Sequence, residues 1–199
     1  MGLMAKGSNG GGGDFETCPA GNHVALCYAV VDLGMQERDW QGEVSVKRRV
    51  RISWELAEEI MADGRPFSAS KEYTLSLNEK ATLRHDLEGW RGRAFTEDEL
   101  AGFDLFNVLG KPCLVNVVHQ QKRDGTGSYA KVIGVTRIPK GLPSPEPVNA
   151  QLWFSLDEPD APEKYAALPE WLQKRIVLKA AAPEPARDAE PDFNDDIPF

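Results

Sequence analysis

The strongest constraint on the fold is the alternating stretch from Val44 to Trp54. Apolar side chains occupy positions 44, 46, 50, 52 and 54, whereas serine, lysine and arginine occupy positions 45, 47, 49, 51 and 53. Successive side chains of a β-strand point to opposite sides, so this period of two predicts a strand with one apolar and one basic face. The apolar face needs a core, and we therefore expect a sheet around this strand.

The flanking segments predict two more strands. His23 to Asp32 is continuously apolar and β-prone, which indicates a buried first strand. Residues 33–42 are expected to form a loop that carries Trp40, and residues 55–62 a helical turn. Residues 67–77 predict the third strand.

A helical region is expected next. Asn78 is a suitable N-cap for a helix in which Leu83, Leu87 and Trp90 recur at spacings of four and three and so share one buried face. Residues 96–99 (TEDE) match a capping box and predict a second short helix.

Two strands at 113–121 and 129–138 are expected to form a hairpin closed by the polar loop 122–128. Three strands, a helix and two strands is the order of an OB-fold. The predicted fold is therefore mainly β, an OB-fold five-stranded barrel with a helix between strands 3 and 4. In this fold the loops at 33–42 and 122–128 flank the face used for nucleic acid.

The remaining segments complete the predicted organisation. A proline-rich linker (139–147) precedes a further short strand (148–156) and a helix that starts near Pro169. The expected parts are a flexible glycine-rich N-terminus (1–18), an OB-fold domain (19–156), an acidic linker and helix (157–179) and a disordered acidic tail for binding other proteins (180–199).

Charge is distributed unevenly along the chain. The formal net charge is -8, yet residues 44–140 contain 16 basic and 13 acidic residues. Residues 183–199 contain six acidic residues and one arginine. A mildly basic body with an acidic tail is an asymmetry that favours a nucleic-acid binder.

The sequence predicts neither catalysis nor a cofactor. It contains no P-loop, dinucleotide fingerprint or nucleophile elbow. Cys18, His23 and Cys27, with Cys113 and His119 as distant partners, could form a zinc site, but they lack a CxxC pair and buried thiols are the preferred interpretation. Three cysteines without a secretory signal indicate a reduced, cytoplasmic protein.

The last eight residues, DFNDDIPF, form a distinct motif. Phe199 combines an aromatic ring with a terminal carboxylate, so it can fill an apolar pocket beside an arginine or lysine. The acidic residues would steer it toward basic surfaces. The predicted interaction residues are Asp192, Phe193, Asp195, Asp196, Ile197, Pro198 and Phe199. An acidic solubility tail is the alternative interpretation.

Residues 195–199 (DDIPF) resemble the C-terminal tip of bacterial single-stranded DNA-binding proteins, which binds nucleases, helicases and other replication and repair enzymes. The segments PAGNHVALCY, ISWEL, TLSLNEKATLRHDLEGWRGRAFTEDELAGFDL and LGKPCL resemble a family of tailed-phage OB-fold single-stranded DNA-binding proteins, over about residues 19–156. The first strand lacks the Asn-Lys-Val and Gly-Asn-Leu pattern of the bacterial proteins, so their base-stacking aromatics have no matching positions here.

Candidate DNA-binding residues follow from chemistry. A groove for single strands needs cations for the phosphates and flat rings for the bases. Three cations about 7 Å apart on one strand face would match a phosphate backbone. The alternatives are a solvated sheet face for these cations, and a lid on the barrel for Trp40. The predicted residues are Lys47, Arg49 and Arg51, then Trp40, Lys122, Arg123 and Tyr129 in the loops, and Arg91 and Arg93 after Trp90, whose ring is a core candidate.

Together these features predict a phage replication or recombination protein that coats single-stranded DNA without sequence preference in an infected bacterial cytoplasm. Its tail would recruit host or phage replication and repair enzymes, and it could form a homo-oligomer. One alternative is an OB-fold adaptor or decoy that binds host enzymes through the tail without binding DNA. A weaker alternative is an RNA-binding OB module.

Overall fold

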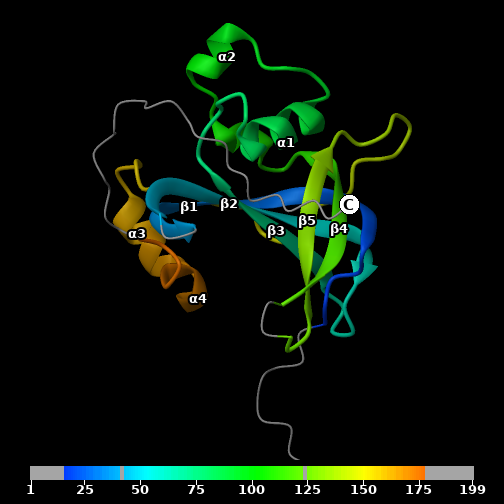
Figure 1. Cartoon of the computed structure of the whole chain (residues 1–199). Helices are drawn as coiled ribbons and strands as arrows, with labels where there is room; N and C mark the ends of the chain where they lie inside the picture. Colours follow the sequence, from blue (N-terminus) through cyan, green and yellow to red (C-terminus); the bar gives the residue numbers. More distant parts are fainter. Residues whose placement is uncertain (1–15, 41–42, 123–124, 178–199) are drawn as a thin grey trace, which may run out of the picture.

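A computed structural model describes residues 16–40, 43–122 and 125–177, and an antiparallel sheet forms its main body (Figure 1). The strands are β1 (Gly21–Trp40), β2 (Glu43–Ile60), β3 (Pro66–Thr74), β4 (Pro112–Gln121), β5 (Ser128–Thr136) and β6 (Leu152–Phe154). Hydrogen-bonded neighbours follow the order β3-β2-β1-β4-β5, and β6 pairs with β1 in parallel.

The helices lie between and after these strands. They are α1 (Thr82–Arg91), α2 (Glu97–Ala101), the 3-10 helix η1 (Leu105–Val108), α3 (Ala161–Ala167) and α4 (Glu170–Gln173). The prediction of a helix between the third and fourth strands is confirmed. It begins at Thr82 with Ala81 as N-cap, so the choice of Asn78 was wrong. The capping box of α2 is confirmed, because Thr96 and Glu99 bond to each other's backbone N–H groups.

The β1–β2 hairpin is longer than predicted. The two strands remain paired from Ala25 and Leu56 to Trp40 and Glu43. Residues 33–40 are therefore not a loop, and residues 55–60 are not a helical turn. Pairing between the strands supplies the backbone hydrogen bonds that these polar segments would otherwise make with water.

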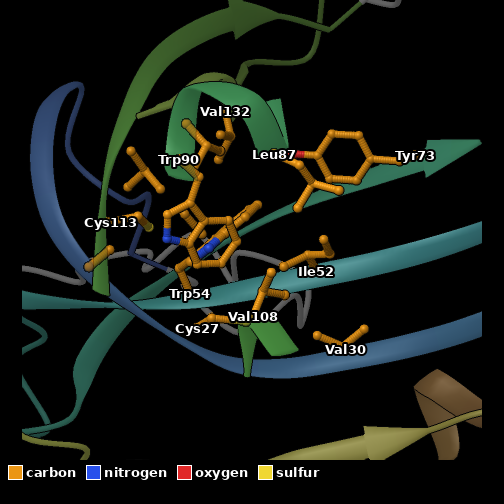
Figure 2. Close-up of a cluster of buried hydrophobic side chains, with 14 of the residues drawn as sticks. Cys27, Val30, Ile52, Trp54, Tyr73, Leu87, Trp90, Val108, Cys113 and Val132 are labelled. Carbon is orange, nitrogen blue, oxygen red and sulfur yellow. The ribbon is translucent and has the colours of Figure 1, made fainter. Parts of the chain in front are cut away.

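The main core lies on one side of β1 and β2 and receives side chains from all five long strands and α1 (Figure 2). Trp54 packs against Trp90 with ring centroids 5.9 Å apart, and the Trp90 indole N–H donates to the Pro112 carbonyl at 2.8 Å. Val44 and Val46, predicted on the apolar face, are exposed because this part of the hairpin extends beyond the core. The other residues labelled in Figure 2 are Cys27, Val30, Ile52, Tyr73, Leu87, Val108, Cys113 and Val132.

The sheet is not closed into the predicted barrel. Among the described residues β3 and β5 are the two edges of the sheet, although some of their Cα atoms approach within 8 Å. Helix α1 contacts both edges. Tyr73 of β3 donates to Asp86 at 2.7 Å, and the Arg137 N–H just after β5 donates to the Gly89 carbonyl at 2.9 Å. The helix thus supplies polar partners at a seam that a strand ladder would close in a full barrel.

A second apolar cluster lies on the opposite side of β1. Phe154, Leu168, Leu172 and Ile176 pack there with Val31 and Leu33. The Val177 N–H donates to the Leu33 carbonyl at 2.9 Å, next to the edge where β6 pairs with β1. The predicted C-terminal strand and helix are therefore present, and Figure 1 shows α3 and α4 beside the β1–β2 hairpin.

Gly34 should be essential for this C-terminal contact. Its φ is +72°, and a Cβ at this position would lie 2.1 Å from the Val177 carbonyl oxygen. We expect Gly34→Ala to lower the free energy of unfolding by more than about 2 kcal/mol, measured by urea denaturation, because backbone strain and overlap act together. Gly64→Ala is the control, since φ is +85° there and no heavy atom lies within 4 Å. Equal losses in the two variants would contradict the role of Gly34.

Candidate nucleic-acid interface

The predicted basic residues of β2 differ in their surroundings. Lys47 is exposed, Arg51 is partly buried, and Arg49 is 6% exposed. Arg49 donates from Nη2 to the Glu72 carbonyl oxygen at 3.0 Å. The stripe is therefore not the fully solvated sheet face of the alternative interpretation, and Lys47 is its most accessible cation.

Glu72 of β3 is the acidic centre of this surface. Arg51 Nη1 lies 3.3 Å from its Oε1, and Arg175 Nη2 lies 2.6 Å from its Oε2. Arg51 also bonds to the Ser70 hydroxyl. Two guanidinium groups thus share one carboxylate, which leaves this cluster with an excess of positive charge.

The arginines change the protonation of Glu72. Burial by itself would raise the pKa of this carboxyl group. The hydrogen bond from Arg175 and the positive charges of Arg175, Arg51 and Arg49 outweigh burial and lower the pKa below its usual value. Glu72 is consequently ionised at neutral pH and holds the arginines in place.

Helix α4 lies over this part of the sheet. The Arg51 Cζ atom is 5.4 Å from the ring centroid of Trp171, a cation–π contact. Gln36 of β1 donates to the Arg175 carbonyl at 2.9 Å, and its cross-strand partner on β2 is Lys47. A continuous surface therefore runs from Lys47, past Arg175, to Trp171.

The other predicted residues occupy different places. Lys122 and Tyr129 are exposed near the β4–β5 turn, where the Tyr129 hydroxyl donates to Gln120 at 3.0 Å. Arg123 lies outside the described residues, as do the side chain of Trp40, residues 1–15 and the tail from Asp192 to Phe199.

Arg91 and Arg93 both contact α2. Arg91 forms an ion pair with Glu99 and stacks over Phe95, with its Cζ atom 4.3 Å from the ring centroid. Arg93 Nη2 lies 2.7 Å from Glu99 Oε1. The Arg93 hydrogen bond, followed by the Thr96 N–H, lowers the pKa of Glu99 to about 2. This ion-paired group joins the end of α1 to α2, and the Arg93 side chain remains 56% exposed.

The described part of the chain contains no group of three or more histidine, cysteine or acidic residues that could hold a metal ion. Burial, with a smaller effect of Glu59, raises the pKa of Cys18 to about 11, and burial raises that of Cys27 to about 12. His119 Nε2 lies 2.8 Å from the Cys18 carbonyl oxygen.

Among the helices of the described residues, none has the length and apolar character needed to span a membrane.

Sequence reasoning missed Glu72, Trp171 and Arg175 as parts of this surface. The expected helix near Pro169 included both Trp171 and Arg175. In the structure α4 ends at Gln173, and Arg175 lies in the turn that follows it. Arg175 lies 103 residues from Glu72 in the sequence, and no periodicity connects segments that far apart.

A scan of protein-family models and a search of curated proteins gave no match to this sequence.

Protonation of Glu72 should weaken its contact with Arg175, which joins the turn after α4 to β3. A carboxyl group whose pKa is lowered by folding stabilises the protein above its unfolded pKa, and this contribution disappears as the pH falls through the folded pKa. We expect the melting temperature of wild type to exceed that of Glu72→Gln at pH 7 and the difference to shrink toward pH 3. Glu79→Gln, at an exposed turn position, is the control. A difference that stays constant with pH would contradict this assignment.

Proposed function

We propose that this protein binds single-stranded DNA without sequence preference, through an OB-fold that is open at one seam, and that its C-terminal tail recruits replication or repair enzymes. The observation that carries the proposal is the strand order β3-β2-β1-β4-β5 with a helix between β3 and β4. In an OB-fold the first strand likewise pairs with the second and the fourth. OB-folds can be partly open and bind oligonucleotides on the face of strands 2 and 3.

The charge on that face supports the same function. Lys47, Arg49 and Arg51 lie on β2, and Arg175 joins them from the C-terminal segment. Glu72 is the acidic residue that both Arg51 and Arg175 contact. Phosphates of a single strand could replace Glu72 as partners of these side chains, with release of counterions into solution.

The proposed function consists of binding alone and involves no covalent step. Binding unpaired strands removes hairpins and shields DNA from nucleases. The tail keeps any enzyme that it holds close to the DNA, because linking two binding events raises the effective concentration of the second. The DDIPF ending supports this part of the proposal by its resemblance to the bacterial tip.

An adaptor that binds enzymes through the tail but not DNA is the second candidate. The burial of Arg49 and the position of α4 over Arg51 favour it, since both reduce the area of cationic surface open to a strand. The two candidates differ in one measurable property, which is affinity for an unstructured oligonucleotide.

Titration with labelled oligo-dT separates these candidates. A coating protein should bind with an affinity that falls with salt, by a log–log slope of about -0.7 for each phosphate contact. Fluorescence anisotropy at two salt concentrations measures this slope, and competition with oligo-U compares DNA with RNA. Absence of binding at low salt would remove the DNA-binding proposal and leave the adaptor.

Removal of Phe199 should affect enzyme binding and leave DNA binding unchanged. We expect a chain that ends at Pro198 to bind a purified single-strand exonuclease that recognises bacterial DDIPF tips about 30-fold more weakly, because the terminal ring and its carboxylate are the anchor. A chain with residues 192–199 scrambled keeps the charge and is the control. If the scrambled chain binds the exonuclease like wild type in surface plasmon resonance, the segment is only an acidic solubility tail.

A further inference from the structure

Trp171 has a large exposed ring that is not part of the apolar cluster that anchors α4. Leu172, the next residue, is 2% exposed, and with Ile176 it fills the apolar cluster against β1. Trp171 remains 56% exposed. The apolar contacts that hold α4 are thus made by other residues, and the indole of Trp171 is left exposed beside them.

One face of the indole is already occupied by a cation. Arg51 of β2 stacks there, and Arg51 is itself fixed by Glu72 and Ser70 of β3. Such a ring is held in position before a ligand arrives. Since ordering a side chain opposes binding, a ring positioned in advance binds a second flat group with less loss of entropy.

A second cation, Arg175, lies on the same surface and shares Glu72 with Arg51. Arg175 is four residues after Trp171, and its side chain is 52% exposed while it contacts Glu72. Lys47 is exposed on the same surface, and its cross-strand partner Gln36 donates a hydrogen bond to the Arg175 carbonyl. This surface therefore offers a flat ring together with two accessible cations, of which Lys47 lies four residues along β2 from Arg51. Single-stranded nucleic acid requires this combination of rings and cations.

We propose that Trp171 and Arg175 form a subsite for one unpaired nucleotide, in which the indole stacks on the base and Arg175 exchanges Glu72 for the phosphate. This inference rests on the proposed function and deepens it. The subsite belongs to the C-terminal segment, so the DNA-binding surface extends from the OB-fold face onto α4. In this arrangement the C-terminal segment contributes to the binding site, and DNA does not have to displace it.

Substitutions at Trp171 test the stacking. Full-length wild type, Trp171→Phe, Trp171→Leu and Phe106→Ala are titrated with labelled oligo-dT at low salt. Trp171→Leu retains an apolar cover over Arg51 but lacks a flat ring, so affinity should fall by about tenfold or more. Trp171→Phe should stay close to wild type. Phe106, which is 51% exposed and packs on Trp153, is the matched control and should bind like wild type.

Tryptophan fluorescence separates base stacking from a purely structural role of Trp171, because only stacking on a base would quench its ring when oligo-dT binds. Trp54 and Trp90 are buried, so oligo-dT should quench mainly the other tryptophans. The difference in quenching at saturation between wild type and Trp171→Phe then measures the contribution of Trp171 apart from those of Trp40 and Trp153, and we expect the variant to lose part of the quenching. Wild-type affinity of Trp171→Leu, or full quenching in Trp171→Phe, would overturn the subsite while the proposed function stands. Absence of oligo-dT binding by wild type would overturn both.

Salt dependence tests Arg175. Loss of one phosphate contact should reduce the magnitude of the log–log slope by about 0.7 in Arg175→Gln. Lys164→Gln is the control, because Lys164 is also paired with acidic residues but lies on α3. An unchanged slope in Arg175→Gln would overturn the phosphate contact.

Discussion

The buried carboxylate of Asp32 makes the polar contacts that hold the C-terminal segment against the β1–β2 hairpin. Asp32 is 6% exposed and accepts hydrogen bonds from the N–H groups of Gly34 at 2.9 Å and Leu156 at 3.1 Å. Arg48 of β2 pairs with it and also with Asp157. A buried carboxylate is stable only when it has hydrogen-bond donors or a cation beside it. The partners of Asp32 come from both the hairpin and the C-terminal segment, so this side chain joins the two.

Burial on both sides of β1 and β2 explains the state of the basic stripe. One side of both strands packs on the main core, whereas on the other side β1 packs on the C-terminal cluster and Arg51 of β2 lies under Trp171. Cations on the second side then need polar partners, and the side chain and main-chain carbonyl of Glu72 supply them. A coating protein built this way would hold its arginines in fixed positions before DNA arrives, which reduces the ordering required on binding.

Much of the fold could be predicted because its signals are local. The strand at Val44–Trp54, the helix with Leu83 and Leu87, and the capping box at Thr96 follow from periodicity and capping chemistry within a few residues. The errors arose where a partner far along the chain decided the outcome. Residues 33–40 look like a polar loop, yet pairing with β2 makes them a strand.

The sequence alone determined the order of the five long strands and of the helix between the third and fourth, the alternation that places three cations on one face of β2, and the separation of a mildly basic body from an acidic tail. Tertiary structure decided which of those cations are accessible, that α1 lies at an open seam between β3 and β5, and that Glu72 meets Arg175 and Arg51 meets Trp171. The physical reason is the sequence distance over which each signal acts. Periodicity reports on neighbours in one element, whereas burial and ion pairing depend on segments that the fold brings together from more than a hundred residues apart.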